Sequence, residues 1–218
     1  MPLPSRTRLV LLALTVAYAG LMEAGGSKVV LAFRVPHDAT IATAYVAQHS
    51  LAIRAGSFFE FVSAIPLGIF MAIIIGRLRM PGDRSAGEPI AALGGIATPM
   101  MLTASALATW SLTRPGVAAA PGAVAALQSL GFDGGGPGFA VFLGLFVAGV
   151  SAGLAGLIPR WLLVLGIVVA AAAELSSLTL LNFTAGYFIP AARFLSIFWM
   201  LGLAFALPSA PSATEGGA

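Results

Sequence analysis

Charge is scarce in this sequence, and cysteine is missing from it. Only 11 basic and 8 acidic side chains occur among 218 residues, while 59% of the residues are hydrophobic. A soluble domain carries about a quarter of its residues as charges. This chain could not cover its own surface in water, so it is predicted to be an integral membrane protein. Without cysteine, the protein has no disulfides, no thiolate catalysis and no cysteine-bound metal.

Long polar segments are also missing. No polar stretch of the sequence is long enough to fold as a second domain, so residues 1–208 are predicted to form one membrane domain in contact with the lipid bilayer. Residues 209–218 are small and polar and are predicted to be a disordered tail. The net charge of +3 does not indicate a nucleic-acid partner, because the arginines are scattered and their grouping fits membrane orientation.

The apolar runs predict an all-α fold, an integral membrane bundle of six transmembrane helices. The predicted spans are residues 9–26, 55–76, 89–112, 139–157, 161–181 and 189–207. After the first span, Pro36 ends any helix and Asp38 is a good N-cap for a new one. The pattern that follows predicts a short amphipathic surface helix between spans one and two. Pro66 is expected to kink span two or to open its hydrogen-bond ladder.

The first span has an alternative interpretation. Arg6 and Arg8 precede the apolar run, and residues 17–19 form a small-x-small triplet, as in a secretory signal. Apolarity at helical period continues past the triplet, which favours a retained first span. The sequence leaves open whether residues 1–19 are cleaved.

Two glycine patterns are given structural interpretations. Gly134, Gly136 and Gly138 resemble part of a phosphate-binding loop, but the Lys and Ser/Thr of a Walker motif and a preceding strand are lacking. They are therefore predicted to form a flexible outer turn. Gly149 and Gly153 have the spacing that lets helix backbones approach closely, and we expect them to pack within the bundle rather than between copies. The oligomeric state is left open.

Six spans place both termini on the same side of the membrane. If the N-terminus is inside, six arginines lie on the inner side and three basic residues on the outer side, with Arg54 at the border. The inner loops are the shorter ones, where the positive-inside rule applies best, so both termini are predicted to be cytoplasmic. The inner set is Arg6, Arg8, Arg77, Arg79, Arg84 and Arg160, and the outer set is Lys28, Arg34 and Arg114.

Four charged residues fall inside the predicted spans. A helix rises about 1.5 Å per residue, which places Glu23, Glu60, Glu174 and Arg193 in the outer half of the membrane. A charge in hydrocarbon costs about 2.5–3.5 kcal/mol, so these residues should be paired or should face a wet cavity. We predict that Arg193 bridges Glu174 and Glu60.

Arg54 or His49 is expected to lie above these charges, and the group is predicted to form a ligand-binding site. The predicted set is Glu60, Glu174, Arg193, Arg54, Glu23 and His49. The alternative is a static ion pair that only fixes the register of the helices. His37 and His49 match no standard metal site, so no metal and no cofactor is expected, and no catalytic residue is assigned.

One set of motifs extends over most of the chain: Val35-Pro36-x-Asp38, Arg54-x-Gly56-x-x-x-Glu60 and Pro159-Arg160 at the start of the fifth span. Together they resemble the small multi-spanning bacterial proteins of the domain-of-unknown-function 4386 type. The resemblance implies six spans, a bacterial inner (plasma) membrane and an acidic residue where Glu60 stands. That family has no assigned activity, so the resemblance implies no catalytic residue.

Three functions remain open at this point. The first is a small binding or transport module with an outer-leaflet polar site for a small ligand, an ion or a proton. The second is a membrane-embedded enzyme that acts on a lipophilic substrate, with Glu60 and Glu174 dividing the roles of acid and base. The third is a structural or regulatory partner protein without a ligand. No charge falls in the inner halves of the spans, which weighs against a pump and favours a one-sided site.

Overall fold

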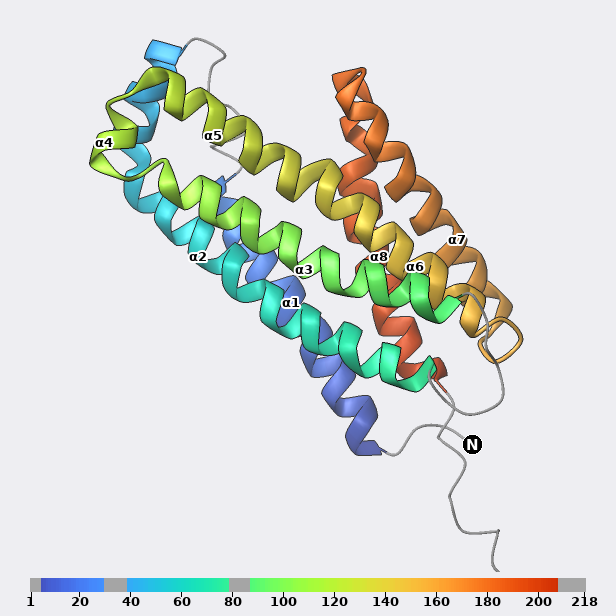
Figure 1. The fold of residues 1–218 in the computed structure, drawn as a ribbon. Coiled ribbons are helices and arrows are strands. Elements are labelled where there is room, and N and C mark those ends of the chain that lie inside the picture. The colour runs from blue at the N-terminus through green and yellow to red at the C-terminus, as the bar shows by residue number, and fades with distance from the viewer. Residues whose placement is uncertain (1–4, 30–38, 79–86, 208–218) are drawn as a thin grey trace, which may run out of the picture.

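The computed structural model describes residues 5–29, 39–78 and 87–207, and these residues contain no strand. Six helical stretches are long and apolar enough to cross a membrane, which confirms the predicted all-α bundle of six spans (Figure 1). The two termini of the described chain lie at the same end of the bundle, as an even number of spans requires.

The six spans form a closed ring. The first three contain α1 (Ser5–Val29), α2 (Ala39–Leu78) and α3 (Gly87–Ser111), and the last two contain α7 (Arg160–Leu175) and α8 (Phe188–Ala206). The fourth runs from Pro121 to Gly153, so it begins well before the predicted residue 139, and it ends in α6 (Phe139–Gly153). Each packs against the next in this order, and α8 returns to contact α1 (Figure 1). The connections from α6 to α7 and from α7 to α8 are short, and antiparallel helices joined by short loops pack side by side.

Span one is a continuous helix. It runs through residues 17–19 without a break, and the Tyr18 side chain inside that triplet is buried in the bundle. Thr15, one turn earlier, is also buried, and its hydroxyl donates to the carbonyl oxygen of Leu11 at 2.9 Å. Cleavage of residues 1–19 would therefore remove buried side chains from this fold.

The helix predicted after Asp38 is present, but it is joined directly to span two. Together they make α2, whose backbone leaves helical geometry at His49 (φ −111°, ψ 17°), while Pro66 lies within the helix. The first part of α2 does not stand alone, because Ala42 and Val46 pack with Val124 of a later helix in a small second core. Asp38 itself and the segment before it lie outside the described residues.

The predicted flexible turn at Gly134–Gly138 is wrong. Residues 113–136, expected to be a link, instead form α4 (Pro115–Ala118) and α5 (Pro121–Asp133), and a π-helical segment, η2 (Gly134–Gly138), leads directly into α6. In α5, which precedes this segment, Gly131 is needed for close packing against α3. A Cβ on Gly131 would lie 2.8 Å from the Thr109 hydroxyl oxygen of α3, which is too close for an unadjusted contact.

Gly149 and Gly153 pack within the bundle, as predicted. A Cβ on Gly149 would overlap the backbone of Ala91 and Gly87 at the start of α3. One turn earlier on α6, Phe146 presses its backbone against Gly94 in the same way. Between apolar helices in lipid, association depends on such close packing, so the line of small residues fixes how α3 lies on α6.

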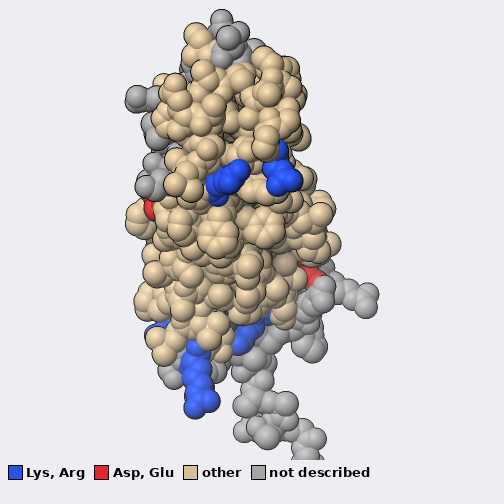
Figure 2. All heavy atoms as spheres, turned by 90° about the vertical axis from the view of Figure 1, so that its left-hand side faces the viewer, with Lys and Arg blue, Asp and Glu red and all other residues tan. Residues whose placement is uncertain are grey.

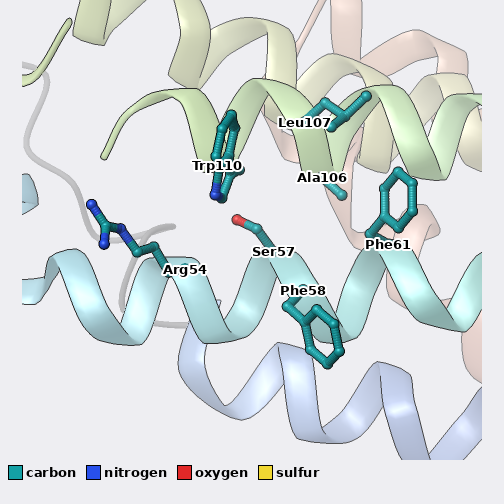
Figure 3. A pocket seen from close by; sticks show the side chains of 7 residues that line it. All are labelled: Arg54, Ser57, Phe58, Phe61, Ala106, Leu107 and Trp110. Atoms are coloured by element: carbon teal, nitrogen blue, oxygen red, sulfur yellow. The ribbon is translucent and has the colours of Figure 1, made fainter. Parts of the chain in front are cut away.

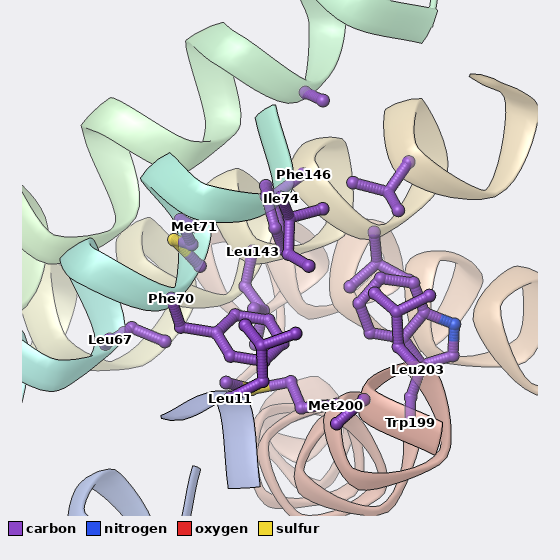
Figure 4. Packing of buried hydrophobic residues seen from close by; sticks show 14 of the residues in the cluster. Leu11, Leu67, Phe70, Met71, Ile74, Leu143, Phe146, Trp199, Met200 and Leu203 are labelled. Carbon is purple, nitrogen blue, oxygen red and sulfur yellow. The ribbon is translucent and has the colours of Figure 1, made fainter. Parts of the chain in front are cut away.

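The apolar core fills the half of the bundle near the termini. Leu11, Phe70 and Leu143 meet there, from α1, α2 and α6, together with side chains of α8 (Figure 4). Phe146 and Trp199 make an edge-to-face contact with ring centroids 6.2 Å apart. Polar side chains are concentrated in the other half, where the candidate site lies.

The turn between spans five and six is compact. Span five continues past α7 into η3 (Ser176–Leu180), and η4 (Phe183–Tyr187) leads into α8. Asn182 caps η4, since its side-chain oxygen accepts a hydrogen bond from the Thr184 backbone N–H at 3.0 Å. This short connection keeps α7 and α8 together as a hairpin.

Candidate functional site

Basic side chains mark two levels on the bundle. Figure 2 shows them at both levels of one face, with an almost uncharged surface between. On α2 the stretch from Arg54 to Arg77 rises about 34 Å, close to the hydrocarbon thickness of about 30 Å. Glu60 comes about 9 Å after Arg54 on this scale. The charges discussed next therefore lie within the apolar zone.

Glu60 and Arg193 are brought together by α2 and α8. The Arg193 guanidinium interacts electrostatically with the Glu60 carboxylate, and the carboxyl also hydrogen-bonds with the Ser105 hydroxyl of α3. Both charged side chains are partly buried. The two residues that the sequence placed at the same depth are therefore neighbours in the fold.

Arg193 is held by the glycine segment. Its Nη2 donates a hydrogen bond to the Gly135 carbonyl oxygen of η2, and its guanidinium lies 4.7 Å from the centroid of the Phe139 ring. A cation over an aromatic face is stabilised by the ring quadrupole. These two contacts fix the guanidinium while its Nε, which is buried, has no hydrogen-bond partner among the described residues.

Gly135 also makes room for Glu60. A Cβ at position 135 would overlap the Ser105 hydroxyl oxygen and would lie 3.1 Å from Oε1 of Glu60. Only glycine lets η2 approach both groups so closely. The segment that looks like a turn in the sequence is therefore one wall of the site.

Tyr18 supplies a further polar group from α1. The side chain is 1% exposed, and its hydroxyl has no hydrogen-bond partner in the described part of the chain. It also interacts electrostatically with Arg193. An unpaired buried hydroxyl costs about 1–3 kcal/mol. We call Tyr18, Glu60, Ser105, Gly135 and Arg193 the Glu60–Arg193 cluster.

Ser105 connects the cluster to α5. Its hydroxyl donates to the Gly131 carbonyl oxygen at 2.8 Å and is the same hydroxyl that hydrogen-bonds with Glu60. A hydroxyl has one proton to donate. When that proton is directed to Gly131, Ser105 can only accept from Glu60, and a carboxyl group donates only when it is protonated.

Glu174 was expected in the same cluster, and the structure places it on the exposed side of α7. Its carboxylate lies against α6, where a Cβ on Gly144 would be 3.0 Å from Oε1. The contacts described for Arg193 run instead to Gly135, Phe139 and Glu60.

The remaining predicted site residues lie elsewhere. His49 is at the kink of α2, where its ring stacks on Tyr45 with centroids 4.1 Å apart. Arg54 is exposed and hydrogen-bonds to Thr113, and Glu23 is exposed on α1. The cluster therefore contains two of the six predicted residues and three that the sequence did not indicate: Tyr18, Ser105 and Gly135.

A metal centre has no evident ligand set here. Within residues 5–29, 39–78 and 87–207, no group of three or more His, Asp or Glu side chains is placed to hold an ion. The chemistry available in the cluster is instead hydrogen bonding and proton transfer, from a carboxyl, a guanidinium and two hydroxyls.

Comparison with known proteins finds no matching family model, no similar curated protein and no similar solved structure. The Glu60–Arg193 cluster is therefore the observation on which a functional conclusion rests.

Proposed function

We propose that the protein is a small membrane-embedded binding module whose ligand is a proton, taken up and released by Glu60. The supporting observation is the position of the Ser105 hydroxyl between Glu60 and the Gly131 carbonyl oxygen. One hydroxyl proton serves two acceptors, so the site has two hydrogen-bond arrangements that differ by one proton.

In the deprotonated arrangement, Ser105 donates to the Glu60 carboxylate, and Arg193 balances its charge. When a proton binds the carboxylate, Glu60 becomes the donor, and the Ser105 hydroxyl turns to Gly131, the geometry seen here at 2.8 Å. Arg193 stays anchored on Gly135 and Phe139 in both arrangements. Proton binding therefore makes or breaks the hydrogen bond from Ser105 of α3 to Gly131 of α5. It does not require α2 or α8, which carry Glu60 and Arg193, to move.

The packing of the bundle favours proton binding from one side of the membrane over proton pumping across it. The half of the bundle near the termini is filled by an apolar core in which Leu67, Phe70 and Ile74 are fully buried. A proton path to that end would need a continuous line of polar groups or water. The Ser151 hydroxyl and the Trp199 indole N–H are buried there, and neither has a hydrogen-bond partner among the described residues. The proposed function is therefore binding from the Arg54 side of the membrane.

Infrared difference spectroscopy tests this proposal. Purified protein is compared between alkaline and acidic buffer, and the band of interest is the C=O stretch of a protonated carboxyl. We expect a band in the wild type that disappears in Glu60→Gln and shifts in frequency in Ser105→Ala, which lacks the hydroxyl. Glu174→Gln is the matched control and should keep the Glu60 band. An identical set of bands in wild type and Glu60→Gln would contradict the proposal.

The orientation belongs to the same proposal. We place the protein in the plasma membrane of a bacterium, as the resemblance to the domain-of-unknown-function 4386 proteins implies, and both termini in the cytoplasm, as the positive-inside rule indicates. Arg8, Arg77 and Arg160 lie near the terminal end, and Arg54 and Arg114 near the other, which supports this orientation by the positive-inside rule. Glu60 would then take its proton from the outer side.

A further inference from the structure

A groove lies between α2 and α3, on a different side of α2 from Glu60. It has a volume of about 260 Å³. Arg54, Ser57 and Trp110 are at one end of it, and Phe61 and Leu107 at the other (Figure 3). The groove is therefore polar at one end and apolar along the rest of its length.

The polar end carries two cations. Arg54 is exposed, and its Nε and Nη2 donate to the hydroxyl and the carbonyl oxygen of Thr113, at 3.1 and 3.4 Å. Arg114 is exposed as well and lies over the Trp110 ring, 5.0 Å from its centroid. Arg54 and Trp110 line the groove, and Arg114, which does not line it, lies next to it on the Trp110 ring.

The apolar end leads toward the middle of the membrane. Phe61 follows Arg54 by about 10 Å along α2. Phe58, Phe61 and Leu107 are 61%, 40% and 52% exposed, so the groove offers apolar side chains that no other part of the described chain covers. The cationic mouth sits where the headgroup layer meets the hydrocarbon, at the level of Trp110, a residue type that favours this interface.

We propose that this groove binds one acidic phospholipid, with its phosphate at Arg54 and Arg114 and one acyl chain along Phe58 and Phe61. Charge complementarity selects the headgroup, because a lipid with net negative charge is attracted to two fixed guanidinium groups and a zwitterionic lipid is attracted less. The apolar part of the groove would hold the acyl chain of the lipid. The site is separate from the Glu60–Arg193 cluster and does not depend on its function.

Quenching of tryptophan fluorescence by brominated lipid tests the proposal. The chain has three tryptophans, and Trp199 is fully buried. A Trp161→Phe parent therefore leaves Trp110 as the exposed one. The parent is reconstituted in nanodiscs with phosphatidylglycerol or phosphatidylcholine brominated on the acyl chain, at equal mole fractions in unbrominated phosphatidylcholine.

We expect brominated phosphatidylglycerol to quench at a lower mole fraction than brominated phosphatidylcholine. Each arginine should contribute about a fivefold preference. Arg54→Gln and Arg114→Gln, in the same parent, should each reduce the preference by that factor. The Arg114 side chain contacts the Trp110 ring and, unlike Arg54, is not tied to Thr113. Arg114→Gln therefore tests the proposal even if Arg54→Gln folds poorly. Arg77→Gln, at the far end of α2, is the matched control and should leave the preference unchanged.

Three results would overturn the proposal. The first is equal quenching by the two lipids in the parent. The second is an equal loss of preference in Arg77→Gln, which would assign it to the general charge of the protein. The third is an unchanged preference in both Arg54→Gln and Arg114→Gln, which would show that these guanidinium groups do not bind the headgroup.

Discussion

Oε1 of Glu60 lies 3.1 Å from the point where Gly135 would carry a Cβ atom. The same Cβ would overlap the Ser105 hydroxyl oxygen, so the backbone of η2 and the carboxyl of α2 face each other with no room for a methyl group. The absence of a side chain at Gly135 therefore allows the Glu60 carboxyl, the Ser105 hydroxyl and the Arg193 guanidinium to lie in one site.

Gly135→Ala should therefore destabilise the protein and separate the groups of the cluster. We expect a loss of about 1–3 kcal/mol, the usual effect of an extra methyl group in a packed interior. Thermal unfolding of the purified protein in detergent measures it. Gly122→Ala is the control, because nothing lies within 4 Å of a Cβ there, and it should be neutral or stabilising. Equal unfolding temperatures for the two variants would contradict this packing.

The two charges of the cluster should respond unequally to neutralisation. Arg193→Met removes the cation and leaves the Glu60 carboxylate inside the apolar zone, and breaking one side of a buried pair costs about 3–5 kcal/mol. Glu60→Gln keeps a hydrogen-bonding group for Ser105 and leaves Arg193 on Gly135 and Phe139, so we expect a much smaller loss. Thermal unfolding of both variants and of the double variant measures the difference.

The double variant Glu60→Gln/Arg193→Met should recover part of the stability lost in Arg193→Met, because it leaves no unbalanced carboxylate. Arg160→Met, at an exposed position at the terminal end, is the control for loss of a positive charge. If both single variants lost as little stability as Arg160→Met, Glu60 and Arg193 would not interact in the membrane.

Tyr18→Phe should leave the unfolding temperature unchanged or raise it. Its hydroxyl is buried without a partner in the described structure, so its removal relieves a penalty of about 1–3 kcal/mol. Tyr187→Phe, at a side chain that is 79% exposed, is the matched control and should have no effect. A clear loss of stability in Tyr18→Phe alone would show that the hydroxyl is hydrogen-bonded in the bilayer.

The level of a residue along the bundle was predictable from the sequence, and its direction around the helix was not. Residue counts along the apolar runs correctly placed Glu60 and Arg193 at one level. Arg54 precedes Glu60 by six residues, which turns it about 240° around the same helix, so it lies in a groove with α3 instead. Glu174 is similarly exposed on α7. Which side of a span faces inward depends on its neighbours.

The glycine run shows a second limit. Consecutive glycines usually mark a turn, and only the fold shows that Ser105 of α3 presses against Gly135 in this segment. The sequence did not indicate Tyr18 as a site residue for a related reason. An aromatic residue in an apolar span gives no sign that its hydroxyl lies near an arginine. The structure of the glycine segment and the position of the Tyr18 hydroxyl both depend on contacts between segments far apart in the sequence. No local sequence pattern indicates such contacts.

Labelling of single cysteines tests the orientation, and the absence of cysteine from the chain makes the background clean. Gly116 in α4 and Ala155 between α6 and α7 are both exposed, at opposite ends of the bundle. We expect a membrane-impermeant maleimide to label Gly116→Cys in intact spheroplasts, and to label Ala155→Cys only after lysis. Denatured samples of both variants control for the reactivity of each cysteine.

The opposite labelling pattern would place the termini outside and would overturn the orientation. It would also change the side of the membrane from which Glu60 takes its proton. The cluster lies nearer the Arg54 end of α2, so its proton would then come from the cytoplasm. Labelling of both variants in intact spheroplasts would mean that the bundle inserts in two orientations, which a bias carried by a few arginines permits. The side from which Glu60 exchanges its proton therefore follows from this experiment together with the infrared band.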